Sequence, residues 1–432
     1  MEIKPNIAQN TISTIIATCP ACGLLCDDVL VENIQSRLKV LNTNCPKSIQ
    51  FFEQNLGENS PKINGQSATL DQAISHAAKI LKVSKRPLFA GLSSDVQGFR
   101  AIYHLAQKTN GNLQHMNSQS LARNMAVLQN TGWQTTTLTE VKNRADVIVC
   151  IGTDIVSHNP RFFERFIWLS NENSDAMFTD SSKREVVYIG ENLNTKAGIS
   201  PDGRQPTSIN CSNADLPEIL AVLRALITGK NLKAQAVAGI QLSALTALVN
   251  QLKQAKYAVL AWIAKDCDYP HAELTIQSIT ETVALLNNQS EKKTGRAAGL
   301  SLGGSDGDTS ANNANTWLSG YSLDNDQNAY DAMVWVNSFN AEKLPPQTDK
   351  PLVVIGNSHT KFKKIPDVFI PIATPGLDCS GTLFRVDSAV VLPLKKLRES
   401  NFATLGAVIG QIEAQLFEFN QINLIAIESN QA

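Results

Sequence analysis

Seven short apolar runs constrain the fold of this chain more than any other feature of its sequence. Most of them are closed by Gly, Asn, Ser or Asp, and several are separated by segments long enough for a helix. Such runs are typical of parallel strands buried on both faces, because the connecting helices cover a parallel sheet. We therefore predict doubly wound α/β layers. The runs are RPLFAGLSS, ADVIVCIGTD, EVVYIGEN, YAVLAWIA, AMVWVNSF, PLVVIGNS and DVFIPIA.

Helical spacing and polar segments divide the chain further. The polar segment 57–68 predicts a boundary, and the apolar residues after it recur at helical spacing, as do those of the tail from Asn401. The segment 287–316 is Gly-rich and too long for a plain connection, so it carries function or is disordered. The apolar helical positions are Ala73, Ile74, Ala77, Ile80, Leu81, Leu405, Val408, Ile409, Ile412 and Leu416.

Four cysteines lie close together near the start of the chain. Cys19, Cys22 and Cys26 lie within one short segment, CPACGLLCDD, and Cys45 follows in NCPKS. Three thiols on a tight loop and a fourth from farther along are the usual ligand pattern of a cubane iron–sulfur cluster. Zinc sites more often show two CxxC pairs, and a disulfide would need an oxidising compartment. Cluster, zinc and unligated thiols stay open, with the cluster favoured.

Composition argues against a purely electrostatic partner. Lysine and arginine total 38 against 39 acidic residues, so no net field favours nucleic acid or an anionic membrane. The start lacks a basic segment followed by an apolar core, and no apolar stretch is long enough to span a membrane. We therefore expect a cytoplasmic protein without nucleic-acid or membrane partners. The scattered cysteines Cys150, Cys211, Cys267 and Cys379 are expected to be buried reduced thiols.

Several residues at strand ends are candidates for binding a nucleotide-like group. Ligands of doubly wound sheets bind beyond the carboxyl ends of the strands, where Gly91, Gly152, Asp154, Gly356 and Asn357 are expected. Glycine at such positions also makes ordinary tight turns, and no GxGxxG occurs there. Both interpretations stay open.

Five segments together resemble a known family. They are the cysteine segments, ADVIVCIGTDIVSHNPRFFERF, NANTWLSGY and DVFIPIATPGLDCSGTLFRVDSAVVLPLKK. The chain is similar to the B subunit of formylmethanofuran dehydrogenase, in the molybdopterin oxidoreductase superfamily. The resemblance implies a 4Fe–4S cluster on the four cysteines, with Lys47 between cluster and pterin. In redox-active members it also implies a molybdopterin guanine dinucleotide carrying tungsten or molybdenum. The residues at matching positions are Lys47, Gly91, Gly152, Asp154, His158, Arg161, Gly356, Asn357, Gly381, Thr382, Arg385 and Asp387.

The chain departs from this family at the metal ligand. In redox-active members a cysteine or selenocysteine binds the metal, whereas the comparable stretch here, MNSQSLARNMAVLQN at 116–130, contains no cysteine. As a lesser alternative, Ser118 or Ser120 would bind the metal in place of the thiolate. Arg123 would likewise face a formate-like anion. Both serines as ordinary loop residues, and Arg123 as a surface charge, are the simpler interpretations.

A chain that resembles this family overall but lacks the metal-binding cysteine is similar to the B-type subunit of the bacterial formyltransferase/hydrolase complex. That resemblance implies a structural, non-redox subunit with A-, C- and D-type partners, in tetrahydromethanopterin-linked oxidation of formaldehyde to formate. It assigns this chain no catalytic residue. The alternatives are an active oxidoreductase interconverting carbon dioxide and formate or formylmethanofuran, and a zinc-stabilised binding module outside one-carbon metabolism.

The resemblance also implies a domain plan, with α/β domains like the superfamily's domains I–III. A small cysteine domain would span 1–63. One Rossmann-like domain would combine 64–120 with 325–398, and a second, 121–324, would be inserted into it. A helix at 399–432 would end the chain.

Overall fold

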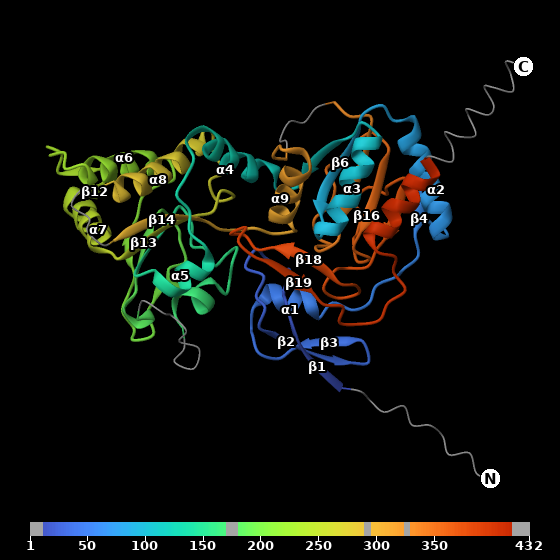
Figure 1. Ribbon diagram of the computed structural model, residues 1–432, viewed down its shortest axis with the longest axis horizontal. Coiled ribbons are helices and arrows are strands. Elements are labelled where there is room, and N and C mark those ends of the chain that lie inside the picture. The colour runs from blue at the N-terminus through green and yellow to red at the C-terminus, as the bar shows by residue number, and fades with distance from the viewer. Residues whose placement is uncertain (1–11, 170–179, 289–294, 324–328, 417–432) are drawn as a thin grey trace, which may run out of the picture. The chain divides into compact units, whose positions relative to one another are not determined.

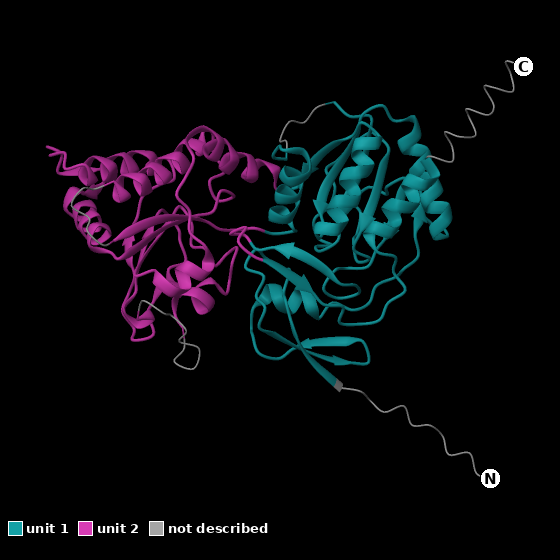
Figure 2. Cartoon of the chain, viewed as in Figure 1, with its two compact units in different colours: residues 1–116, 305–385, 391–432 teal, residues 117–304, 386–390 magenta. Residues whose placement is uncertain are grey.

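The computed structural model describes residues 12–169, 180–288, 295–323 and 329–416. The chain forms two compact units (Figures 1 and 2). Unit 1 comprises 1–116, 305–385 and 391–432, and unit 2 comprises 117–304 and 386–390. Unit 2 is therefore inserted into unit 1, and the cysteine segment belongs to unit 1. The finer division into four domains stays a prediction.

The core of unit 1 is a seven-stranded sheet of order β5-β4-β17-β16-β15-β6-β7. The five strands from β17 to β7 run parallel, and the hairpin β4–β5 adds an antiparallel edge. That hairpin lies within the segment 57–68, which the sequence suggested as a boundary. The strands are β4 (Lys62–Ile63), β5 (Gln66–Ser67), β6 (Pro87–Ser93), β7 (Asn112–His115), β15 (Ala332–Asn337), β16 (Leu352–Gly356) and β17 (Val368–Pro371).

Amphipathic helices cover this sheet. Helix α2 (Leu70–Val83) begins with a capping box, in which the Thr69 side chain accepts from the backbone of Gln72 and the Gln72 side chain accepts in return. Helix α3 (Val96–Lys108) is capped by Asp95. A further helix spans 405–416, and its apolar residues Leu405, Val408, Ile409 and Ile412 are buried. Residues 417–432 of the predicted tail helix lie outside the described residues.

The cysteine segment connects the strands of a small antiparallel sheet in unit 1. Strands β1 (Ile12–Ala17), β2 (Val29–Ile34) and β3 (Arg37–Val40) pair in that order, and the short helix α1 (Pro46–Phe52) follows. A second antiparallel pair, β18 (Gly381–Phe384) and β19 (Val391–Leu394), also belongs to unit 1. The loop between β1 and β2 thus carries three of the four clustered thiols.

The sheet of unit 2 has five parallel strands in the order β10-β9-β8-β13-β14. All seven strands predicted from apolar runs are confirmed in the two sheets, as is the α/β fold class with parallel sheets. The strands of this sheet are β8 (Val147–Ile151), β9 (Glu185–Ile189), β10 (Thr207–Ile209), β13 (Tyr257–Trp262) and β14 (Arg296–Ser301). Unit 2 also contains the antiparallel pair β11 (Ala236–Val237) and β12 (Ile240–Gln241). Its helices are α4 (Ser118–Thr131), α5 (Leu138–Arg144), α6 (Leu216–Ile227), α7 (Leu242–Gln254) and α8 (Ala272–Asn287).

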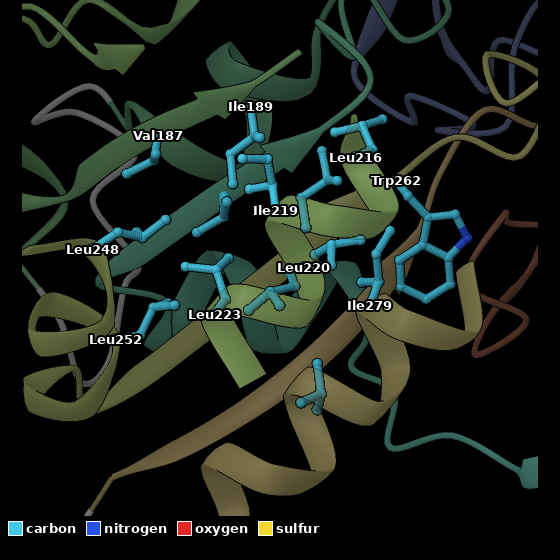
Figure 3. Packing of buried hydrophobic residues seen from close by; sticks show 14 of the residues in the cluster. Val187, Ile189, Leu216, Ile219, Leu220, Leu223, Leu248, Leu252, Trp262 and Ile279 are labelled. Carbon is cyan, nitrogen blue, oxygen red and sulfur yellow. The ribbon is translucent and has the colours of Figure 1, made fainter. Parts of the chain in front are cut away.

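Aliphatic side chains from three helices fill the core of unit 2 (Figure 3). Leu216, Ile219, Leu220 and Leu223 of α6 lie in one cluster with α7, α8 and the strands. Burying one such side chain fully contributes about 1.5–3 kcal/mol. The helical apolar spacing thus fixes which face of α6 packs inward.

The interpretation of 287–316 as one long loop was wrong. Strand β14 lies inside it, and helix α9 (Asp308–Ser319) begins there. The strand was missed because RAAGLS contains no β-branched or aromatic residue of the kind that marks strands. Residues 289–294 lie outside the described residues.

The described helices are short. The longest, α8, has 16 residues, and no helix in the described ranges is long and apolar enough to cross a membrane.

A substitution at Gly91 in β6 can test how tightly the sheet of unit 1 is packed. Its φ is +78°, and a Cβ there would lie 2.5 Å from the carbonyl oxygen of Val336. We expect Gly91→Ala to lower the free energy of unfolding by at least about 2 kcal/mol, measured by urea denaturation. Gly406→Ala is the control, because no atom lies within 4 Å of its Cβ position in the helix 405–416. That change should raise stability by up to about 1 kcal/mol, and equal effects of the two changes would contradict the packing.

Candidate functional site

The cysteine loop of unit 1 is closed by backbone hydrogen bonds. The amide of Cys19 donates to the carbonyl of Cys26 at 2.9 Å, and that of Leu25 donates to Cys22 at 3.2 Å. Leu25 is left-handed, with a φ of +46°, so the loop turns sharply before Cys26. Cys45 directly precedes α1. The side chains of all four clustered cysteines are buried in unit 1.

The chemistry of these thiols suits a soft cation. The pKa of Cys19 is raised to about 12, mainly by burial and also by the neighbouring thiols of Cys22 and Cys45, although a 3.3 Å contact with the Ser48 hydroxyl acts in the opposite direction. Ionising several of these thiols therefore calls for a compensating metal, and four thiolates suit iron or zinc. No group of three or more His, Cys, Asp or Glu side chains in the described ranges is arranged to hold a metal ion. The ligand role of the four cysteines stays a prediction, as does the role of half-buried Lys47 on α1.

Among the predicted cofactor residues of unit 1, Gly356 and Asn357 lie at the carboxyl end of β16, where internal contacts hold them. A Cβ on Gly356 would lie 2.6 Å from the carbonyl oxygen of Asn337. The side-chain amide of Asn357 donates to Gln54 Oε1 at 3.1 Å and to Thr374 Oγ1 at 3.4 Å. Tight packing explains Gly356, as it does Gly91, and hydrogen bonding explains Asn357. A cofactor role for them stays a prediction.

Asp95 occupies the N-terminus of α3 at this edge. Its carboxylate accepts hydrogen bonds from the amide of Gly98 at 3.0 Å and from that of Thr382 at 3.4 Å. A Cβ on Gly381 would lie 2.9 Å from Asp95 Oδ2, and burial raises the pKa of Asp95. A helix N-terminus is where a pyrophosphate would bind, so this carboxylate fits a dinucleotide poorly.

The same edge also keeps unsatisfied polar atoms. The strand order of the unit 1 sheet reverses between β6 and β15, and ligands usually bind at such a point in folds of this kind. Ser93 is the last residue of β6, Ser94 comes next, and Ser338 directly follows β15. The hydroxyls of these three serines are buried and have no hydrogen-bond partner among the described residues.

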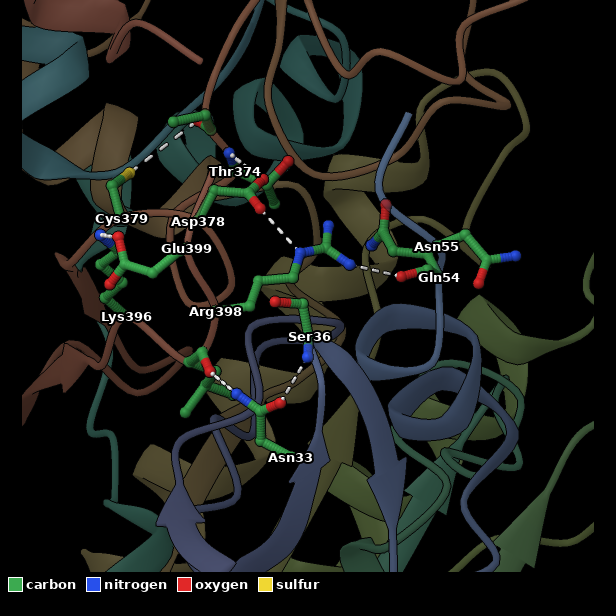
Figure 4. A network of polar contacts seen from close by, with 12 residues as sticks. Asn33, Ser36, Gln54, Asn55, Thr374, Asp378, Cys379, Lys396, Arg398 and Glu399 are labelled. Carbon is green, nitrogen blue, oxygen red and sulfur yellow. Dashed lines mark hydrogen bonds and ion pairs between the residues drawn. The ribbon is translucent and has the colours of Figure 1, made fainter. Parts of the chain in front are cut away.

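A buried ion pair joins the loops that follow β17 and β19 in unit 1 (Figure 4). Arg398 Nε donates to Asp378 Oδ1 at 2.8 Å, and both side chains are 3% exposed. A second nitrogen of Arg398 donates to the carbonyl of Gln54 at 2.6 Å, and the amide of Thr374 donates to Asp378 Oδ2 at 3.0 Å. The pair thus connects the chain after α1 with the loops that follow β17 and β19.

A second buried polar cluster of unit 1 surrounds His115 at the end of β7. A ring nitrogen of His115 lies 3.2 Å from the carbonyl oxygen of Asp306, and Lys343 Nζ lies 2.7 Å from Asp306 Oδ2. Burial lowers the pKa of His115, and burial alone would raise that of Asp306, but the charge of Lys343 lowers it overall. The ion pair therefore keeps Asp306 charged in the interior.

In unit 2, a second set of predicted residues follows β8. His158 Nε2 lies 2.6 Å from Asp266 Oδ1, and both side chains are about one quarter exposed. Asp266 follows β13, so the pair lies where the strand order of this sheet reverses. Arg161 is buried and pairs with the exposed Glu164 through two nitrogens, at 3.1 Å and 2.5 Å.

The other predicted residues of unit 2 have structural contacts. Gly152 is left-handed, with a φ of +64°, and its amide donates to Ile189 at 2.8 Å. Asp154 accepts from the amide and the hydroxyl of Ser157, each at 2.9 Å. Asp387 Oδ2 accepts from the amide of Leu138 at 2.8 Å, at the start of α5. Arg385 directly follows β18 in unit 1, so the Arg-x-Asp motif is divided between the two units.

The stretch that lacks the metal-binding cysteine forms α4 and the residues before it. Ser118 is 3% exposed, and its hydroxyl has no partner among the described residues. The hydroxyl of Ser120 donates to the carbonyl of Asn117 at 2.9 Å. Arg123 donates to the carbonyl of Ala264 at 3.0 Å and pairs with Asp268 at 2.5 Å. Arg123 is thus engaged within unit 2.

Sequence reasoning missed the partners of these residues. Asp95 had a signal, because an aspartate just before a helix is a typical cap. Asp266, Asp378 and Arg398 had none, because their partners are 20 to 344 residues away along the chain.

Comparison with known proteins places these features in context. No family profile matches the chain. The chain is 24% identical over 417 residues to the B subunit of the tungsten-containing formylmethanofuran dehydrogenase 2 of Methanococcus maripaludis, covering 88% of this chain and 92% of the relative. It is 36% identical over 90 residues to the B subunit of the formyltransferase/hydrolase complex Fhc of Methylorubrum extorquens, covering 21% of this chain and 25% of that relative.

Solved structures show the same fold. A chain of the formyltransferase/hydrolase complex FhcABCD from Methylorubrum extorquens, crystallised with methylofuran, matches with a TM-score of 0.68 and 21% identity. The match covers 84% of this chain and 99% of that chain. Acetylene hydratase from Pelobacter acetylenicus matches with a TM-score of 0.59 and 11% identity, over 93% and 69% of the two chains. The resemblance inferred from the motifs and the predicted molybdopterin-oxidoreductase-like fold are both confirmed.

Substitution of the buried pair of Asp378 and Arg398 tests how much it stabilises the loops that follow β17 and β19 in unit 1. Replacing Asp378 with asparagine leaves the Arg398 charge buried without its partner, so we expect stability to fall by about 3–5 kcal/mol. Glu399→Gln is the matched control, because the neighbouring pair of Glu399 with Lys396 is exposed and should contribute less than about 1 kcal/mol. Urea denaturation measures both variants. Similar losses in the two would contradict a central role for the buried pair.

Proposed function

We propose that this chain is a structural, non-redox subunit of a multi-subunit complex that handles one-carbon formyl units. Its partners would be A-, C- and D-type subunits of a formyltransferase/hydrolase complex, in tetrahydromethanopterin-linked oxidation of formaldehyde to formate. One observation carries the proposal. The chain is related over 88% of its length to the B subunit of a tungsten enzyme, yet the stretch 116–130 contains no cysteine.

The surroundings of α4 support the absence of redox chemistry. Arg123 is engaged by Asp268 and Ala264, so it is already committed to contacts other than a formate-like anion. In unit 1, Asp95 places a carboxylate at the helix end where a pyrophosphate would otherwise be stabilised. No residue of this chain is assigned a catalytic step.

We propose further that Cys19, Cys22, Cys26 and Cys45 hold a 4Fe–4S cluster that braces the loop between β1 and β2. When bound, such a cluster supplies folding free energy through its thiolate bonds, and it needs no electron partner for that role. Burial of all four side chains and the closely spaced thiols around Cys19 support this assignment.

The alternative function is that of a working component of a formylmethanofuran dehydrogenase. The retained cysteines, Lys47 and the buried Ser118 hydroxyl, which lacks a partner among the described residues, are the observations in its favour. A serine oxygen at that position would have to replace the thiolate on tungsten or molybdenum.

Metal and pterin content separates these two functions. We expect the full chain, purified without oxygen and in complex with its partners, to contain tungsten and molybdenum far below one per chain. Denatured samples should show no pterin fluorescence, because α4 offers no thiolate for the metal. Inductively coupled plasma mass spectrometry and fluorescence provide the two readings. Either metal near one per chain together with pterin would overturn the structural role.

The same preparation tests the cluster. We expect about four iron atoms and about four acid-labile sulfides per chain, and Cys22→Ser should remove most of both. Cys379→Ser is the control, since this thiol lies outside the cysteine loop and its change should leave the iron content unaltered. Zinc in place of iron would assign a zinc site, and absence of both metals would show that the thiols are unligated.

A further inference from the structure

Unit 1 displays two large aromatic side chains that its own packing does not use. Trp317, at the end of α9, is 67% exposed, and Tyr321, just beyond it, is 76% exposed. Both belong to the motif NANTWLSGY, which has no part in the site described above. Large aromatic side chains are usually much more buried, so a pair this exposed calls for an explanation.

Hydrogen bonds hold the turn that carries these rings in one conformation. Gly320 is left-handed, with a φ of +80°, and its amide closes α9 by donating to Thr316 at 2.8 Å. The buried side-chain amide of Asn315 donates to the carbonyl of Tyr321 at 3.0 Å. The amide of Tyr321 donates to the hydroxyl of Ser319 at 3.0 Å. Both aromatics are thus presented from a fixed backbone, which reduces the entropy lost on binding.

Arg100 of the neighbouring helix α3 completes this surface. Helices α3 and α9 pack against each other within unit 1 (Figure 1). The guanidinium carbon of Arg100 lies 5.5 Å from the centre of the Trp317 ring, a cation–π distance. One nitrogen of Arg100 donates to Gln97 at 3.1 Å, and its Nε is buried without a partner among the described residues. A carboxylate brought by a partner would pair with the charge of this guanidinium.

We propose that Arg100, Trp317 and Tyr321 form a docking surface for another protein subunit of the complex. That subunit would present an apolar pocket to the Trp317 ring and an Asp or Glu side chain to Arg100. Trp, Tyr and Arg are the residue types that dominate binding energy at protein interfaces. The inference rests on the proposed function, which supplies the partner, and adds which face of this chain that partner occupies.

The charge balance favours a protein over a nucleic acid at this surface. Base stacking on exposed aromatics is normally accompanied by several cations that follow the phosphate backbone. Arg100 is the one cation shown in contact with these rings in the described residues, and the whole chain has a formal net charge of −1. A single arginine beside two aromatics instead matches a carboxylate within an apolar contact.

Association of the full chain with co-expressed A-, C- and D-type subunits tests the surface. We expect the double change Trp317→Ala and Tyr321→Ala to weaken assembly at least about 30-fold, measured by analytical ultracentrifugation. Arg100→Glu should weaken it as well, because it sets two carboxylates against each other. Val83→Ala is the control, since Val83 is 79% exposed on α2 of the same unit and should have no effect.

Tryptophan fluorescence gives a second reading that does not depend on the variants. Trp317 is the exposed one of five tryptophans, whereas the other four are buried or half-buried. Acrylamide should therefore quench the isolated chain strongly and the assembled chain much less.

The outcomes separate this inference from the proposed function. If the wild-type chain assembles and the aromatic variant assembles equally well, the docking surface is wrong while the structural role stands. If Trp317 is already shielded from acrylamide in the isolated chain, residues of the chain itself cover the surface and the inference fails. If the wild-type chain does not assemble at all, both proposals fail.

Discussion

Burial of both faces of two parallel sheets is the constraint on which the rest of this structure depends. Parallel strands need crossover helices, and those helices can bury their apolar sides only against the sheet. Loops therefore leave the sheet at its carboxyl edge, and residues from distant parts of the chain gather there. Both sets of candidate residues, around Asn357 in unit 1 and around His158 in unit 2, owe their positions to this arrangement.

The polar groups at these edges are held mainly by one another. Asp378 and Arg398 lie in an ion pair, Asp95 caps a helix, and Asp306 pairs with Lys343. Buried charges are stable only when they are paired and hydrogen-bonded, so each such group fixes the position of its neighbours. The hydroxyls of Ser93, Ser94 and Ser338 at the edge of unit 1 differ, since they are among the buried polar atoms that lack partners in the described residues.

A fold built in this way does not need a metal to hold its sheets together. The helix α4 in unit 2 has an ordinary buried residue at Val127, and its side chains Arg123 and Asn124 form hydrogen bonds within the unit. Loss of a metal-binding thiolate at the start of such a helix removes chemistry without removing packing. This is the physical reason why a relative of a tungsten enzyme can serve as a structural subunit, as proposed. The four cysteines before α1 follow a different rule, because a metal bound to buried thiolates would add folding free energy to the loop between β1 and β2.

The sequence by itself determined seven strands of the two parallel sheets, helix α2, the helix 405–416 and the positions of the clustered cysteines. These features depend on the local pattern of apolar side chains, which repeats every two or every 3.6 residues whatever lies elsewhere in the chain. Only the tertiary structure decided the order of the strands, the membership of 57–68 in a sheet, and the partners of Asn357, His158 and Arg398. It also revealed strand β14, which lacks the β-branched and aromatic residues that give a local strand signal. Such pairings join residues that are far apart along the chain, and local periodicity carries no information about which distant groups the packing brings together.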